Sequence, residues 1–393
     1  MTTILLLAVY VGFTGLGVPN SLFGVGWPAI YPELGLPLSG ANYVTLLVSA
    51  MTMLSSFLCA RAINRFGYGR VVACAVALSA LALLGYSVSG SLLAFCLFSI
   101  PLGIGAGAID SGLNNFMALH FRATHMNFMH CAFGVGVALS PYLMSVALGQ
   151  GRGWRTGFRW GFFAQTLILL VVLAAIRLFD RAEPSKQETE QTPPVTLRLP
   201  QMIRMPKVRL FCLIFFCANT LELTCGNWGS TYMVNSKGMS VDAAAAVVSV
   251  YYVGLTAGRF LAGLLAGRLS SLRLIFLGVG MMLASILLLL LPLSPGATTL
   301  VLFFLGAGIG PICPNINQIT PESFGAAYSQ SVMGMQIAAG YFGVMLMPTL
   351  FGFLAQWLGT GILPVFLLAT LAVTFLALLR IRKMNAAQSA ETV

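Results

Sequence analysis

The sequence predicts an all-α integral membrane protein whose twelve transmembrane helices form two six-helix bundles. Hydrophobic residues make up 58% of the 393 residues, charged residues make up 8%, and the mean hydropathy is +0.90. Soluble domains carry about 25% charged residues, so the chain is not one of them. The apolar residues come in blocks of about twenty, the length that an α-helix needs to cross a bilayer. The short alternating strands of a membrane barrel are absent from the sequence.

The apolar blocks predict the helices in chain order. The first block has neither a preceding lysine or arginine nor a small-residue cleavage site, so we interpret it as a retained helix and not as a signal peptide. The predicted spans are 4–30, 41–61, 70–88, 92–119, 127–148, 158–178, 209–233, 242–266, 273–292, 298–320, 328–356 and 361–380.

One long polar segment, "FDRAEPSKQETEQTPPVTLRLPQMIRMPKVR", divides the chain after the sixth block. It mixes both charges with prolines and would not insert into a bilayer. We therefore expect an N-terminal six-helix bundle over 1–178 and a cytoplasmic linker over 179–208. A C-terminal six-helix bundle with a short cytoplasmic tail is expected over 209–393.

The basic residues predict the orientation in the membrane. If both termini are cytoplasmic, sixteen of the 21 lysines and arginines lie in inner loops and tails, and four lie in outer loops. This bias follows the positive-inside rule and predicts a multi-pass protein of the cell (inner) membrane with both termini cytoplasmic. The basic residues are scattered and are not interleaved with aromatic residues, so the expected partners are the lipid bilayer and a small-molecule solute, with no nucleic acid. We expect a functional monomer.

The two halves contain an internal repeat. Adding 203 to the residue number carries Arg65 to Arg268 and Arg70 to Arg273. The same offset carries Asn114 to Asn317 and places Cys313 at the position of Asp110. It also aligns two glycine triplets, Gly103, Gly105 and Gly107 with Gly306, Gly308 and Gly310. Two segments in one register favour a duplication, and a parallel repeat of six helices is a known transporter design.

The loop "ARAINRFGYGR" resembles the signature of the major facilitator superfamily between its second and third helices. Arg65, Gly67 and Arg70 match that signature, while Asn64 stands where the family has an aspartate. The segments "GIGAGAIDSGLNNFMA", "NFMHCAFGVGVALSP", "LELTCGNWGSTYM" and "GMQIAAGYFGVMLMP" resemble the fucose permease-like branch. The resemblance implies the major facilitator fold and a secondary active transporter that couples sugar uptake to protons, with sodium as the alternative ion. Proton-coupled export of hydrophobic compounds stays open as an alternative function.

Acidic residues are scarce, and two of the ten stand out. Asp110 and Glu222 lie inside predicted spans, where a carboxylate costs about 2.5–3.5 kcal/mol, so each needs a wet cavity or a partner. Both are therefore candidates for proton coupling or substrate contact. Asp110 shares a helix face with Asn114, and the alternative for it is a structural hydrogen bond to a neighbouring helix. The alternative for Glu222 is an ion pair with Arg259.

Polar and aromatic residues in the spans are candidates for contact with a solute, because amides suit hydroxyl pairs and an indole face suits a sugar ring. The candidates are Asn20, Trp27, Asn114, Asn115, Asn219, Asn227, Trp228, Asn315, Asn317, Gln318 and Gln336. For the two tryptophans the alternative is an anchor at the membrane interface. Candidates for gating or ion pairing are Arg65, Arg70, Arg259, Arg268 and Glu322.

The remaining titratable residues point to no other chemistry. His130 begins the fifth predicted span, where it either senses pH or makes a structural hydrogen bond. The eight cysteines stand singly, without metal-ligand spacing. No nucleophile-base pair or phosphate loop is present, so we expect neither an enzyme nor a bound metal or cofactor. A membrane enzyme or scaffold is the unfavoured alternative class.

Overall fold

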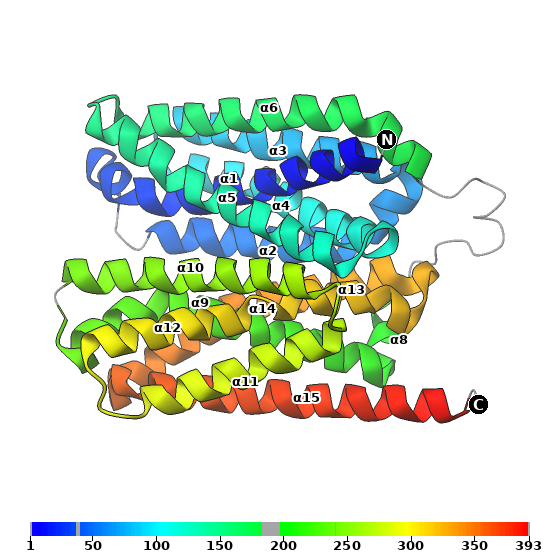
Figure 1. Ribbon diagram of the computed structural model, residues 1–393. Helices are drawn as coiled ribbons and strands as arrows, with labels where there is room; N and C mark the ends of the chain where they lie inside the picture. The colour runs from blue at the N-terminus through cyan, green and yellow to red at the C-terminus, as the bar shows by residue number, and fades with distance from the viewer. Residues whose placement is uncertain (1, 37–39, 183–196, 240, 392–393) are drawn as a thin grey trace. The chain divides into compact units, whose positions relative to one another are not determined.

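The computed structural model describes residues 2–36, 40–182, 197–239 and 241–391, and within these ranges it contains helices and no strands (Figure 1). The N-terminal part contains α1 (Thr2–Glu33), α2 (Gly40–Phe66), α3 (Tyr68–Val88), α4 (Leu92–His120), α5 (Ala123–Gly149) and α6 (Gly153–Ala182). The C-terminal part contains α8 (Leu199–Arg204), α9 (Pro206–Lys237), α10 (Val241–Leu265), α11 (Ser271–Leu289), α12 (Pro295–Ile309), α13 (Ile312–Phe324), α14 (Ala326–Leu358), the 3₁₀ turn η1 (Thr360–Ile362) and α15 (Leu363–Glu391).

Twelve helical segments of the described chain are long and apolar enough to cross a membrane, which confirms the predicted number. The tenth, Pro295–Phe324, consists of two helices, because α12 ends at Ile309 and α13 begins at Ile312. Pro311 stands in the gap; it has no N–H to continue the ladder, and its ring crowds the preceding turn. The side-chain amide of Asn315 donates to the Pro311 carbonyl at 2.7 Å and so supports the chain where the helix is interrupted.

The described residues group into two compact units. The first contains those of 1–121, 128–196 and 320–338, and the second contains those of 122–127, 197–319 and 339–393. The predicted bundles 1–178 and 209–393 differ from these units at 122–127 and 320–338, and the division into bundles stays a prediction. Of the predicted linker, residues 183–196 lie outside the described residues, while α6 continues to Ala182 and α8 begins at Leu199.

The two glycine triplets have equivalent packing within their units. In the first unit, the outer glycines of the first triplet are Gly103 and Gly107, and a Cβ atom at either would overlap the backbone of α2. A Cβ atom at Gly105 would overlap the backbone of α3. In the second unit the outer glycines of the other triplet, Gly306 and Gly310, meet α10 in the same way, and Gly308 meets α11. Small residues thus let α4 and α12 pack closely against equivalent neighbours within each unit.

The signature loop is a one-residue connection. α2 ends at Phe66, α3 begins at Tyr68, and Gly67 between them has a φ of 80°. That left-handed backbone conformation is open to glycine at little cost, which explains the glycine at this position. The tight connection places Tyr68, which is buried, directly at the start of α3.

Candidate functional site

A hydrogen-bonded chain of three side chains, Asp110, Asn114 and His130, joins α4 to α5 in the first unit. The Asn114 amide nitrogen donates to the Asp110 carboxylate Oδ1 at 2.8 Å and to the Asp110 backbone oxygen at 2.8 Å. The Asn114 amide oxygen lies 2.9 Å from His130 Nε2. Because an amide oxygen only accepts, Nε2 must carry a hydrogen and donate it. The carboxylate and the imidazole are therefore connected through one amide, and we call these residues the Asp110 chain.

The Asp110 chain lies among apolar packing. Asn114 is fully buried, His130 is nearly so, and Asp110 is half-buried. The ring of Phe13 meets the His130 ring edge-on, with centroids 5.0 Å apart. Asn114 and His130 thus link α4 to α5, and the Asp110 carboxylate joins this link through Asn114 on its own helix.

A second buried cluster in the first unit surrounds Asn115. The Asn115 amide donates to the Tyr68 hydroxyl, and the Ser329 hydroxyl donates to the Asn115 oxygen at 2.7 Å. The Tyr68 hydroxyl donates to Gln330 Oε1 at 3.5 Å, and Gln330 Nε2 donates to the Ser111 hydroxyl at 3.1 Å. Both polar ends of the Asn115 amide are therefore engaged by protein groups. Sequence reasoning singled out Asn115 but missed its partners, which lie 47 and 214 residues away along the chain.

Glu222 and Arg259 form an ion pair between α9 and α10 in the second unit, with 3.3 Å between Arg259 Nη2 and Glu222 Oε2. The Arg259 and Glu222 side chains are 7% and 14% exposed. The Tyr251 hydroxyl donates to the Glu222 backbone oxygen at 3.0 Å and packs beside the pair. Arg259 Nε is buried and has no hydrogen-bond partner among the described residues. The alternative that we considered for Glu222 is thus realised, and the pair carries no net charge.

The other solute candidates fall into different environments. Trp27 is buried, with its ring 5.2 Å from Phe23 and 6.3 Å from Tyr31. Trp228 donates its indole N–H to the Pro348 carbonyl at 2.9 Å, so it connects α9 to α14. Asn20 and Asn227 are exposed.

The amides of the seventh, tenth and eleventh spans are buried or half-buried. Asn219 donates to the Phe215 carbonyl at 2.9 Å and faces Cys313 Sγ at 3.8 Å. Gln336 accepts a hydrogen bond from Thr320 at 3.1 Å. Asn317 is buried and Gln318 is half-buried, both on α13.

Four of the five candidates for gating lie at or near helix ends. Arg70 approaches Asp180 at 4.0 Å, with both side chains well exposed, and the Arg65 guanidinium lies 5.3 Å from the Phe66 ring centroid. Arg268 and Glu322 are exposed and form no ion pair within the described ranges. Of the five candidates, Arg259 alone is buried in an ion pair there.

Glu33, an acid outside the predicted spans, has protein partners. Glu33, at the end of α1, accepts a hydrogen bond from Trp154 Nε1 at 2.7 Å and forms an ion pair with Arg155, both in the first turn of α6. The hydrogen bond from Arg155 is the main cause that lowers the pKa of Glu33 below its ordinary value of 4.5. No spacing in the sequence indicates this contact, because the partners are 121 and 122 residues apart.

Known proteins resemble this chain over most of its length. At 25% identity over 313 residues it is similar to the cis,cis-muconate transport protein of Acinetobacter baylyi, covering 75% of this chain and 73% of that protein. It is also 25% identical over 301 residues to bypass of stop codon protein 6 of Saccharomyces cerevisiae, covering 68% of this chain and 60% of that protein.

Solved structures share the fold. The transporter FucP in its outward conformation matches with a TM-score of 0.77 at 16% identity, over 96% of this chain and 98% of that one. The proton:xylose symporter XylE matches with a TM-score of 0.79 at 15% identity, over 97% and 95%. The sequence model of the Major Facilitator Superfamily matches residues 7–348 and 230–392. The twelve spans, the signature loop and this match together show that the chain is a multi-pass membrane protein and belongs to the Major Facilitator Superfamily.

Proposed function

We propose that the protein is a proton-coupled symporter of a neutral polyhydroxylated solute such as a sugar, with the Asp110 chain as its proton-binding group. The observation that carries the proposal is the hydrogen-bonded sequence from the Asp110 carboxylate through Asn114 to His130. A carboxylate inside a membrane span needs a partner or a wet cavity, and Asp110 is half-buried beside the Asn114 amide.

The neutral character of the second unit's polar centre supports a neutral solute. Glu222 and Arg259 cancel each other's charge, and the buried polar groups of the same unit include the hydroxyls of Thr220 and Thr224 and the amides of Asn315 and Asn317. Amides donate and accept hydrogen bonds together, as paired sugar hydroxyls require. Fold likeness to FucP and XylE, the latter described as a proton:xylose symporter, agrees with this substrate class.

Uptake by the purified protein in proteoliposomes tests the proposal. Radiolabelled fucose and xylose are offered with an alkaline interior, with and without a protonophore, and with a sodium gradient as a separate arm. We expect accumulation that the protonophore abolishes and that Asp110→Asn removes, while gradient-independent exchange of the sugar persists. The Glu33→Gln variant, which changes an exposed carboxylate outside the spans, is the control. No accumulation of any sugar, or full accumulation by Asp110→Asn, would contradict the proposal.

His130→Gln separates the parts of the Asp110 chain. Glutamine can still donate a hydrogen bond to the Asn114 oxygen, but it cannot titrate. If the proton resides on Asp110 alone, this variant keeps accumulation. If the imidazole shares the proton, accumulation falls while exchange persists.

One observation favours a second candidate, the symport of an organic acid. Arg259 Nε is buried without a hydrogen-bond partner among the described residues, and a guanidinium is suited to binding a carboxylate. The relative from Acinetobacter baylyi is named for transport of cis,cis-muconate, a dicarboxylate. In the same proteoliposomes, accumulation of cis,cis-muconate without any sugar uptake would favour this candidate. If unlabelled muconate lowers the uptake of labelled sugar, the two solutes share a site. If it does not, muconate does not bind at the sugar site.

A further inference from the structure

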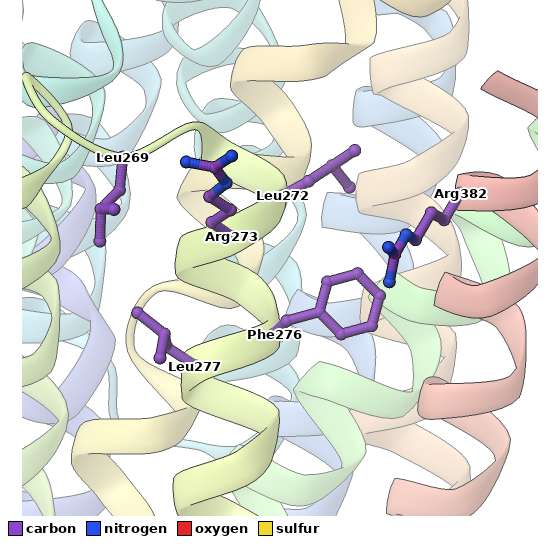
Figure 2. Close-up of a pocket in the computed structure, with 6 residues that line it drawn as sticks. All are labelled: Leu269, Leu272, Arg273, Phe276, Leu277 and Arg382. Carbon is purple, nitrogen blue, oxygen red and sulfur yellow. The ribbon is translucent and has the colours of Figure 1, made fainter. Parts of the chain in front are cut away.

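A groove of about 540 Å³ lies between α11 and α15 in the second unit, away from the polar groups described above (Figure 2). It is lined by Leu269, Leu272, Arg273, Phe276, Leu277 and Arg382. The two helices pack against each other beneath it, where the Phe276 and Phe375 rings meet at right angles with centroids 6.3 Å apart. In Figure 2 the Arg382 side chain reaches from α15 toward the Phe276 ring, and Arg273 stands about one turn from that ring on α11.

The groove joins a charged mouth to an apolar floor. Arg273 and Arg382 are exposed, and neither has a carboxylate within 4.0 Å among the described residues. Below them, Leu272 and Phe276 are half-buried and Leu277 is 58% exposed. Both helices belong to membrane spans, Ser271–Leu289 and Thr360–Asn385, so the apolar part faces a region that acyl chains occupy.

The charge around the mouth is of one sign. Arg268, Arg380 and Lys383 are exposed in the same segments, which gives five basic residues over 268–273 and 380–383 without an acidic residue between them. The distribution of basic residues predicts this end of the spans to be cytoplasmic. Arginine binds phosphate through parallel hydrogen bonds, and basic pockets between membrane helices on the cytoplasmic side suit anionic lipid headgroups.

We infer that this groove binds one anionic phospholipid, with its phosphate between Arg273 and Arg382 and an acyl chain along Leu272, Phe276 and Leu277. Free phosphate shares the headgroup chemistry, but it would leave the apolar floor empty. The inference is independent of the proposed function, because it uses no residue of the Asp110 chain or of the Glu222–Arg259 pair.

Thermal stability of the purified protein in detergent tests the inference. The protein is titrated with phosphatidylglycerol, with phosphatidylcholine of the same acyl chains, with glycerol phosphate and with inorganic phosphate. We expect a saturable rise in melting temperature with phosphatidylglycerol and little change with the other three. In the double variant Arg273→Gln/Arg382→Gln the apparent Kd for phosphatidylglycerol should weaken by about 30-fold, from the loss of two cations near the headgroup.

Two further variants keep the test decisive. Arg177→Gln removes an exposed arginine at the end of α6 in the first unit and should keep the wild-type response. Leu277→Trp fills the floor of the groove while both arginines remain, and it should weaken phosphatidylglycerol binding even if the double variant fails to fold. An unchanged response in the double variant, or an equal response to inorganic phosphate, would overturn the inference. The first outcome would indicate general attraction of lipid to basic helix ends, and the second a small-anion site.

Discussion

Replacing Glu222 by glutamine leaves the Arg259 guanidinium, whose side chain is 7% exposed, without its carboxylate. At 3.3 Å and an effective dielectric constant of about 20, the lost attraction is about 5 kcal/mol. Part of this attraction only offsets the cost of removing both charges from water. We therefore expect the free energy of unfolding to fall by about 3–5 kcal/mol, the range found for broken buried pairs. Arg259→Met should lose a similar amount, because it strands the Glu222 carboxylate instead.

The double variant Glu222→Gln/Arg259→Met contains no stranded charge, so its stability should return to within about 1–2 kcal/mol of the wild type. The assay is unfolding of the detergent-solubilised protein, followed by tryptophan fluorescence for all four proteins of the cycle. The exposed pair of Glu33 and Arg155 is the matched control, where Arg155→Gln should cost less than about 1 kcal/mol. If both single variants of the buried pair lie within 1 kcal/mol of the wild type, or if their losses add in the double variant, the reasoning fails.

Three other measurements check separate parts of the structure. Asp110→Asn should remove the dependence of sugar uptake on external pH between about 5 and 8, while sugar exchange continues. An unchanged pH profile would mean that the coupling proton binds to a group other than Asp110. The pKa of Glu33 is lowered on folding, so its contribution to stability is complete above 4.5 and is lost as the pH falls through the folded pKa. Melting temperatures between about pH 6 and 3 should therefore fall less steeply in Arg155→Gln, and parallel curves would refute the contact. Gly306→Ala should lower the free energy of unfolding by about 1–3 kcal/mol, because the added Cβ overlaps the backbone of α10. A Cβ at Gly280 meets nothing within 4 Å, so Gly280→Ala should leave the free energy of unfolding unchanged or raise it slightly.

Local patterns account for what could be predicted from the sequence. The lengths of the apolar blocks predicted the twelve spans, because a bilayer imposes one helix length on every segment. The spacing of Asp110 and Asn114 predicted a shared helix face, and the hydrogen bond of 2.8 Å between their side chains confirms it. The aligned glycine triplets predicted a repeat, and the structure gives them equivalent neighbours, α2 and α3 for the first and α10 and α11 for the second.

Contacts between distant segments were not predictable in the same way. The partners of Asn115 and of Glu33 are fixed by how whole helices pack, and no periodicity within a helix encodes that. Trp228 illustrates the limit: sequence reasoning left a substrate contact and an interfacial anchor open. The structure shows its indole N–H bound to a carbonyl of α14, which neither interpretation contains.

The matched packing of the two glycine triplets has an evolutionary consequence. A duplication, which the aligned triplets favour, would give both halves the same steric demands along one helix, and positions 110 and 313 differ in chemistry without disturbing that packing. One copy now holds a carboxylate beside the Asn114 amide, and the other holds the Cys313 thiol beside the Asn219 amide. A carboxylate at position 313 would therefore also have an amide donor nearby, and Cys313→Asp would make the two halves alike at this position.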